Sequence, residues 1–397
     1  MGAGVGAIHR RAEETESSGA KLQQFRKVTI AHPHLLAARE RLITAISDAP
    51  RNSVVFVLGP TGVGKTTLRA KVESDLTAGL APDLKHDKGR LPVVSVEAVA
   101  PDTGNFSWRD HFRRLLGVMR EPLIDYKLDR QGRPRGATES LFRFDPAARS
   151  SGAEYQYAVE QALRYRRPAA VLIDEAQHLA KMSSGRRLLD QLDVIKSIAN
   201  CTGTPHVLVG TYDLLAFRNL SGQLSRRSLD VHFGRYRADR PGEAAIFVNV
   251  LRSFAAKLPI AEPPDLVKDW EFLYERSIGC VGIVKDWLVM ALSSMFGRGA
   301  NRLERKDLDA CALSVTQCDK LLSECIEGET RLEEGNDGRL RLRVQLGLNG
   351  CGTPGAGQHR SNAPPTSVDS PRKAGRRPGQ RRPKRDPIGR SAAVHGT

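Results

Sequence analysis

Residues 59–66 read GPTGVGKT and match the pattern G-x-x-x-x-G-K-[ST]. Glycines at this spacing let consecutive backbone N–H groups curl around phosphate oxygens, and the start of a following helix adds partial positive charge. A lysine that ends such a loop reaches the β- and γ-phosphates, and the hydroxyl after it holds Mg²⁺. The sequence therefore predicts that a nucleoside triphosphate is bound by Gly59, Pro60, Thr61, Gly62, Val63, Gly64, Lys65, Thr66 and Thr67.

A second chemical signal is the adjacent pair Asp174 and Glu175, which ends an aliphatic run. Ligands of open parallel sheets bind at the carboxyl ends of the strands. We expect Asp174 to approach Mg²⁺ together with Thr66, and Glu175 to polarise the water that attacks the γ-phosphate. The alternative is a solvated acidic pair at a strand end. No N-K-x-D guanine signature follows, so the carboxylate pair favours ATP hydrolysis.

Three more residues have positions that suit the same chemistry. Thr211 follows the run HVLVG, and a polar residue there would lie beside the γ-phosphate, between the loop and Glu175. The alternative role for Thr211 is a helix N-cap. Arg226 and Arg227 precede a fifth aliphatic run, and one of them could stabilise the γ-phosphate bound by a neighbouring subunit. The alternative for this pair is a solvated basic helix end.

The elements that would position these residues alternate between strand and helix. Short aliphatic runs predict strands at 54–59, 92–99, 169–174, 206–210 and 229–236, with helices at 34–48 and 65–76. Strands separated by helices indicate a parallel sheet with crossover helices, which is an α/β fold. From 265 to 334 the apolar residues recur only at helical spacing, so a smaller all-helical domain is expected there.

Composition suggests four regions: a flexible arm at 1–30, an αβ ATPase domain at 31–258, a helical lid at 259–335 and a disordered basic tail at 336–397. Residues 351–397 hold ten Lys or Arg against two Asp, and such a stretch cannot offset the entropy of ordering. The Arg- and Pro-containing stretch 120–150 is longer than an ordinary connection, which is typical of a functional or mobile insertion.

The net charge of +16 and pI near 9.8 favour polyanionic partners, nucleic acid first. No apolar run approaches the roughly 18 residues of a membrane span, so no membrane association is expected. No secretory signal is visible and six cysteines are sparse, which together predict a cytoplasmic location. Cys311, Cys318 and Cys325 lie seven residues apart, the spacing of a packed helical stripe.

The order of these motifs, followed by a helical lid, resembles that of AAA+ ATPases. The local sequences DEAQHLAK, VLVGTYDLL, QLSRR and SIGCVGIVKDWLVMAL are similar to those of the TniB/TnsC group of transposition ATPases. The resemblance implies an AAA+ P-loop NTPase with a five-stranded parallel sheet and a lid. It also implies ATP, Mg²⁺, and a homo-oligomeric ring or filament on double-stranded DNA, without sequence specificity, that links a target-selection protein to a transposase.

Within that resemblance, the residues that carry over are Lys65, Thr66, Asp174, Glu175, Thr211 and either Arg226 or Arg227. The lid departs from the common pattern, because Lys285 stands where many AAA+ proteins have a second sensor arginine. A lysine cannot make the bidentate contact of an arginine.

DNA contact is predicted at the segment NFSWRDHFRRLLG, through Trp108, Arg109, Arg113 and Arg114. The alternative is an exposed amphipathic helix with Phe112, Leu115 and Leu116 facing inward. Two other functions stay open at this stage. One is a loader in replication or recombination, and the other is a signalling NTPase switch that acts on protein partners.

Overall fold

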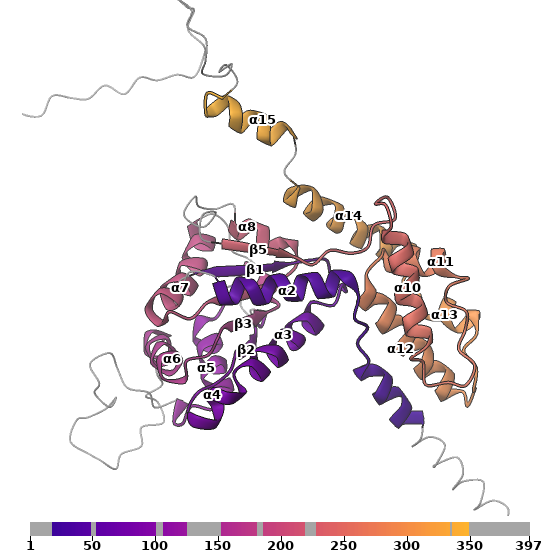
Figure 1. Ribbon diagram of the computed structural model, residues 1–397, viewed down its shortest axis with the longest axis horizontal. Helices are drawn as coiled ribbons and strands as arrows, with labels where there is room; N and C mark the ends of the chain where they lie inside the picture. Colours follow the sequence, from indigo (N-terminus) through magenta and orange to yellow (C-terminus); the bar gives the residue numbers. More distant parts are fainter. Residues whose placement is uncertain are drawn as a thin grey trace, which may run out of the picture. The chain divides into compact units, whose positions relative to one another are not determined.

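The computed structural model describes residues 18–48, 53–100, 106–124, 152–180, 186–218, 228–333 and 336–348 (Figure 1). The chain divides into two compact units, Met1–Gly335 and Asn336–Thr397. Four predicted features lie wholly or partly outside the described residues: residues 1–17 of the arm, most of the 120–150 insertion, Arg226 and Arg227, and residues 349–397 of the tail.

A five-stranded parallel sheet forms the centre of the first unit. Its strands are β1 (Val54–Leu58), β2 (Val94–Glu97), β3 (Val171–Asp174), β4 (His206–Gly210) and β5 (Ser228–His232). The order across the sheet is β2-β3-β4-β1-β5, and every pair is parallel. All residues of β1 and β4 are buried, as expected for strands covered on both faces. The predicted α/β fold with a five-stranded parallel sheet is confirmed.

Helices cover both faces of this sheet, because alternate strand residues point to opposite sides. On one face Val55 and Val57 pack with α2 (Pro33–Asp48) and α3 (Lys65–Gly79). On the other face Val54, Phe56 and Leu58 pack with α5 (Trp108–Val118), α6 (Gly152–Arg166) and α7 (Arg186–Thr202). The short elements are α4 (Ala81–His86), η2 (Ala176–Leu179), η3 (Tyr212–Leu214) and α8 (Leu215–Arg218).

A helical lid follows the sheet, as Figure 1 shows. Its helices are α10 (Glu243–Ala255), α11 (Trp270–Ser277), α12 (Val281–Gly297), α13 (Arg305–Cys311) and α14 (Val315–Leu332). Trp287 Nε1 donates to the carbonyl of Leu308 at 2.7 Å and ties α12 to α13. Among the described residues, no single helix is long and apolar enough to cross a membrane. The pair α11 and α12 would qualify only together, and it bends by 109°.

Three predicted regions differ from the structure. Residues 18–27 are helical rather than part of a flexible arm, because Phe25 and Ile30 are buried in the lid core. The lid core also includes α10 through Phe247 and Phe254, so the lid begins before residue 259. In the second unit, α15 (Asn336–Gln345) is helical where a disordered tail was expected. Its leucines distinguish this stretch from the proline-rich residues that follow.

Candidate functional site

The phosphate loop connects β1 to α3, as the sequence predicts. Gly62 and Gly64 have φ values of 77° and 111°, a left-handed backbone that favours glycine. A side chain on Gly59 would overlap the backbone carbonyl of Phe233, which follows β5. The loop can therefore follow this path only with glycine at these three positions.

Lys65 begins α3 and turns back into the loop. Its Nζ donates to the carbonyl oxygens of Gly59 at 3.0 Å and Pro60 at 2.9 Å, and the residue is buried. Burial lowers the pKa of Lys65, and the nearby carboxylate of Glu175 opposes that shift most strongly. A buried ammonium whose hydrogen-bond acceptors are two backbone carbonyls of a glycine-rich loop fits a polyphosphate ligand.

The carboxylate pair lies at the tip of β3. Asp174 is buried and its Oδ2 accepts a hydrogen bond from Arg69 Nε at 3.0 Å, while Oδ1 accepts from the Glu175 backbone N–H at 3.0 Å. Arg69 also contacts Glu73 and Ser95. Sequence reasoning missed Arg69. The available signal was its position four residues after Lys65, which places both side chains on one face of α3.

Thr211 lies at the tip of β4, and β4 is the strand between β1 and β3. The strand order thus places Thr211 between the phosphate loop and Glu175, as predicted. Thr211 is the N-cap residue of η3 but makes no side-chain cap hydrogen bond. Its hydroxyl donates to Asp213 Oδ2 at 3.1 Å instead. The position suits contact with a phosphate, and the capping alternative is not supported by the geometry.

Two further loop residues, Thr66 and Thr67, lie in the first turn of α3. Thr66 is exposed and follows Lys65 directly, so its hydroxyl is accessible for a cation. Thr66 and Asp174 offer hydroxyl and carboxylate oxygens, which are the donors that Mg²⁺ prefers. Because Arg69 already contacts Asp174 Oδ2, the Asp174 contact with a cation is expected to pass through water. The donor set therefore fits a magnesium ion.

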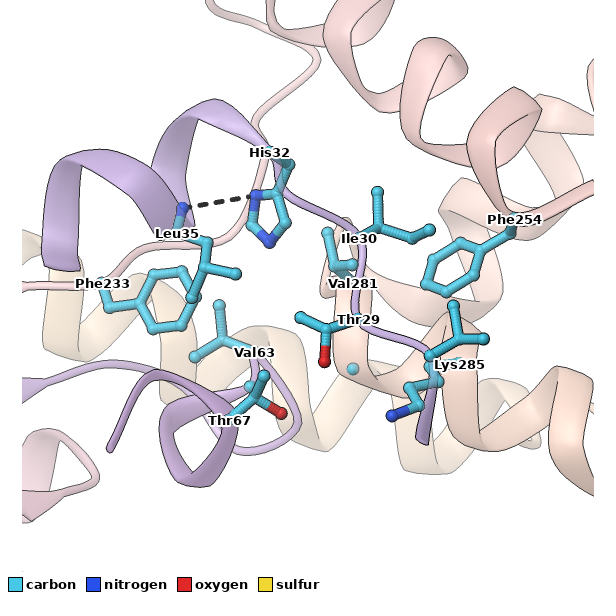
Figure 2. A pocket seen from close by; sticks show the side chains of 13 residues that line it. Thr29, Ile30, His32, Leu35, Val63, Thr67, Phe233, Phe254, Val281 and Lys285 are labelled. Atoms are coloured by element: carbon cyan, nitrogen blue, oxygen red, sulfur yellow. Dashed lines mark hydrogen bonds between the residues drawn. The ribbon is translucent and has the colours of Figure 1, made fainter. Parts of the chain in front are cut away.

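The lid packs directly on the phosphate loop. The backbone N–H of Ile283 donates to the carbonyl of Gly62 at 3.0 Å, and a methyl group on Gly282 would overlap that carbonyl. Lys285 follows on the same helix and lines a pocket with Gly64 and Thr67 (Figure 2). Burial lowers the pKa of Lys285. The structure thus brings Lys285 beside the loop, in the region where the sequence predicted it.

The pocket in Figure 2 is mostly apolar, and sequence reasoning missed most of it. It measures about 30 Å³, roughly the room for one water molecule, so a purine could enter only if the lid moved. The missed signal was the run KVTI before Pro33, which was assigned to the flexible arm. The pocket walls come from five parts of the chain and comprise Val28, Thr29, Ile30, His32, Leu35, Val63, Phe233, Phe254 and Val281.

A second cavity of about 300 Å³ lies on the other side of the loop. Pro60, Thr61, Gln177 and Thr211 form one wall, and α14 forms the opposite wall. Gly328 of α14 packs flat on the ring of Tyr212, where any side chain would overlap the ring. We call this space the α14 cavity. It has room for a terminal phosphate and water next to Thr211.

The predicted DNA-contact helix α5 has the amphipathic form of the alternative interpretation. Phe112, Leu115 and Leu116 are buried, whereas Arg109, Arg113 and Arg114 are exposed. Trp108 is not available to stack on a base, because it packs against Phe106, His111 and Phe112 and its Nε1 donates to Gln191. Only the arginine part of this prediction remains compatible with the structure.

The fold and the loop together define a P-loop nucleotide hydrolase in which a polar strand end lies between the phosphate loop and the carboxylate pair at the tip of β3. Residues 50–217 match the family model described as an AAA domain. This part of the chain is an AAA ATPase domain that binds ATP. No curated relative matches the sequence.

Three solved structures show similarity to this chain. The ORC2 protein of Aeropyrum pernix, in ADPNP–ADP complexes, has a TM-score of 0.48 and 15% identity over 74% of this chain and 71% of its own. The ORC1 protein of the same organism, in complex with DNA, has a TM-score of 0.47 and 20% identity, covering 71% and 65%. The Walker-type ATPase paby2304 of Pyrococcus abyssi has a TM-score of 0.40 and 15% identity, covering 78% and 75%. These likenesses are too distant to transfer the ligands or partners of those proteins.

Proposed function

We propose that this chain is an ATP-driven switch that assembles on double-stranded DNA as a homo-oligomer and is released by hydrolysis. The observation that carries the hydrolytic part is the strand order β3-β4-β1, which lines up Glu175, Thr211 and Lys65 along one edge of the sheet. A phosphate chain held at Lys65 would extend past Thr211 toward Glu175. This arrangement supplies binding, sensing and water activation in one place.

Each side chain has a distinct part in this proposal. Lys65 holds the terminal phosphates, Thr211 contacts the γ-phosphate, and Glu175 accepts a proton from the attacking water. Thr66 and Asp174 would hold Mg²⁺, which supplies positive charge to the phosphate oxygens when bound. Lys285 approaches the nucleotide from the lid, and the Figure 2 pocket receives the base once the lid has moved.

The DNA part of the proposal is supported by charge. The chain carries +16 overall, and α5 exposes Arg109, Arg113 and Arg114 on one face. Arg109 and Arg113 are exposed candidates for phosphate contacts, as is Arg114, which is paired with Asp110 at 2.6 Å. Contacts of this kind neutralise phosphates without reading bases.

The finer role has two candidates. A loader in replication or recombination needs a partner helicase or clamp, in addition to the ATPase domain, the lid and DNA. A transposition regulator of the TniB/TnsC type also needs a transposase and a target-selection protein, and the local sequences DEAQHLAK and VLVGTYDLL favour it. Both roles place the protein in the cytoplasm. A signalling switch that ignores DNA is the remaining alternative.

The test uses the full chain, duplex DNA and electron microscopy with a non-hydrolysable ATP analogue. We expect a ring or filament that needs both nucleotide and DNA, and Glu175→Gln should form the same assembly with ATP and hold it. A monomer under all conditions, with ATP turnover unchanged by DNA, would support the signalling switch instead. Adding a transposase to the trapped assembly separates the two DNA roles, because only the transposition regulator should bind it.

A matched pair of variants tests the DNA contact. Arg109→Gln with Arg113→Gln should reduce the slope of log affinity against log salt by about two, because each phosphate contact contributes roughly 0.9. Arg302→Gln with Lys306→Gln removes the same charge from exposed positions of the lid and should leave the slope unchanged. Equal slopes in the two double variants would remove α5 from the interface.

A further inference from the structure

Gln177 lies two residues after Glu175 and is buried in η2. It lies within the local sequence DEAQHLAK, but the sequence assigned it no role in the site. Its side chain nevertheless occupies the space between the tips of β3 and β4, the two strands that carry Glu175 and Thr211. This placement raises the question of what a buried amide does there.

Both ends of the Gln177 amide are engaged. Its Nε2 donates to Glu175 Oε2, and its Oε1 accepts a hydrogen bond from the backbone N–H of Thr211 at 3.3 Å. The two contacts fix which way the amide points, because the carboxylate needs a donor and the N–H needs an acceptor. Gln177 thus links the carboxylate that would activate water to the strand end that would sense phosphate.

The end of β4 is shaped to admit this amide. A methyl group on Gly210 would overlap Gln177 Oε1 and would also come within 2.9 Å of Leu214. Gly210 is not among the residues with a positive φ in the described part of the chain. Glycine at position 210 is therefore required for space and not for backbone conformation, and the space is filled by Gln177.

Glu175 depends on this support more than an ordinary strand-end residue would. Its backbone is left-handed, with φ of 51° and ψ of 32°, so the chain turns sharply just where the carboxylate leaves the strand. One carboxylate oxygen contacts Gln177, which also lines the α14 cavity together with Thr61 and Thr211.

We propose that Gln177 is a positioning residue that fixes the orientation of the Glu175 carboxylate relative to the tip of β4. A shift of Thr211, such as contact with a γ-phosphate would cause, is passed through the amide to Glu175. The inference rests on the proposed role of Glu175 in activating water. Gln177 is not among the residues that line the pocket of Figure 2, and its side-chain hydrogen bonds are to Glu175 and Thr211, so we assign its effect to Glu175.

Two substitutions of Gln177 separate positioning from simple packing. Gln177→Leu keeps the approximate volume and loses both hydrogen bonds, and Gln177→Glu can still accept from Thr211 but sets a carboxylate against Glu175. We expect kcat for ATP hydrolysis to fall roughly 10- to 100-fold in both, because a misplacement near 1 Å costs about that much. The dissociation constant for ATP should stay within about twofold.

Gly210→Ala provides an independent perturbation, because it displaces the amide without changing its chemistry. We expect the same fall in kcat. Gln191→Glu is the control: it makes the same charge change in α7 and keeps an oxygen for Trp108 Nε1, so its kcat should match the unsubstituted protein.

Measuring ATP turnover of Glu175→Gln in the same assay distinguishes failure of the Glu175 role from failure of the Gln177 role. If Glu175→Gln retains normal turnover, the role of Glu175 fails and the inference falls with it. If Glu175→Gln is inactive but Gln177→Leu keeps kcat within about twofold, only the positioning role is overturned. If Gln177→Leu lowers the ATP affinity and the melting temperature as well as kcat, the positioning role is also overturned, because such a combined loss indicates a structural defect.

Discussion

A buried ion pair joins α14 to the segment after β5, and Glu329→Ala tests how much this pair stabilises the docked helix. Arg235 Nε donates to Glu329 Oε1 at 2.9 Å and Nη2 donates to Oε2 at 3.2 Å, a two-point contact with both side chains 9% exposed. Apart from Glu329, the contact of Arg235 is with the carbonyl of Ile278 at 3.4 Å. Removing the carboxylate leaves a buried guanidinium without its anion.

The expected cost follows from that burial. Breaking a buried ion pair by removing one partner costs about 3–5 kcal/mol, because the remaining charge is desolvated and uncompensated. If α14 opens locally, a loss of about 3 kcal/mol makes its amides exchange roughly a hundredfold faster. Glu327→Ala is the control on the same helix. Its pair with Arg331 is 65% and 55% exposed, and such pairs contribute about 1 kcal/mol or less.

The measurement is hydrogen exchange of peptides from residues 315–332 in both variants. Alanine is introduced into the same helix in each case, so helix propensity cancels between them. Adding Arg235→Ala to Glu329→Ala should restore part of the protection, because the unpaired charge is then removed. Equal exchange in Glu329→Ala and Glu327→Ala would refute the idea that the buried pair holds α14 over the cavity.

Three other predictions concern binding, assembly and pH. Lys65→Ala should abolish ATP binding measured by equilibrium titration, and undiminished affinity would contradict the loop assignment. Arg226→Ala alone should hydrolyse ATP slowly. Mixing it with Lys65→Ala subunits should restore hydrolysis, because the Arg226→Ala subunit still binds ATP and the Lys65→Ala subunit still supplies the arginine. Normal turnover of Arg226→Ala by itself would exclude a finger in trans. Burial lowers the pKa of His206 from 6.5 to about 4. Between these pH values the unfolded chain binds more protons than the folded chain. The free energy of unfolding therefore falls by roughly 3 kcal/mol as the pH drops through this window. His206→Gln should flatten the pH dependence of the melting temperature between pH 6.5 and 4, and an unchanged slope would rule His206 out as the cause.

The local features were predictable because they depend on neighbours in sequence. The run VVFVL is buried on both faces, and its alternation places Val55 and Phe56 on opposite sides of the sheet. The loop after it needs glycine at positions 62 and 64 for its positive φ values, and this requirement is visible in the pattern itself. Helix α3 and the carboxylates at the end of β3 follow by the same local reasoning.

Contacts between distant segments could not be predicted in this way. Residues 28–30 gave no sustained period, yet they complete a pocket with Phe233 and Phe254, more than two hundred residues away. No sequence pattern indicated a role for Gln177. The structure shows that its amide contacts both Glu175 and Thr211, which lie at the ends of two neighbouring strands. Trp108 was predicted to contact DNA because its helix is basic, but its indole ring packs against the hydrophobic core.

The sequence by itself determined the catalytic chemistry, since a phosphate loop and a carboxylate pair need only the right residues at short spacing. The tertiary structure alone decided how those groups are oriented and covered. Inserting β4 between β1 and β3 brings Thr211 to the site, and the packing of α14 buries Glu329 against Arg235. Such arrangements are set by the packing of segments far apart in the chain, where burial and charge pairing outweigh local preference.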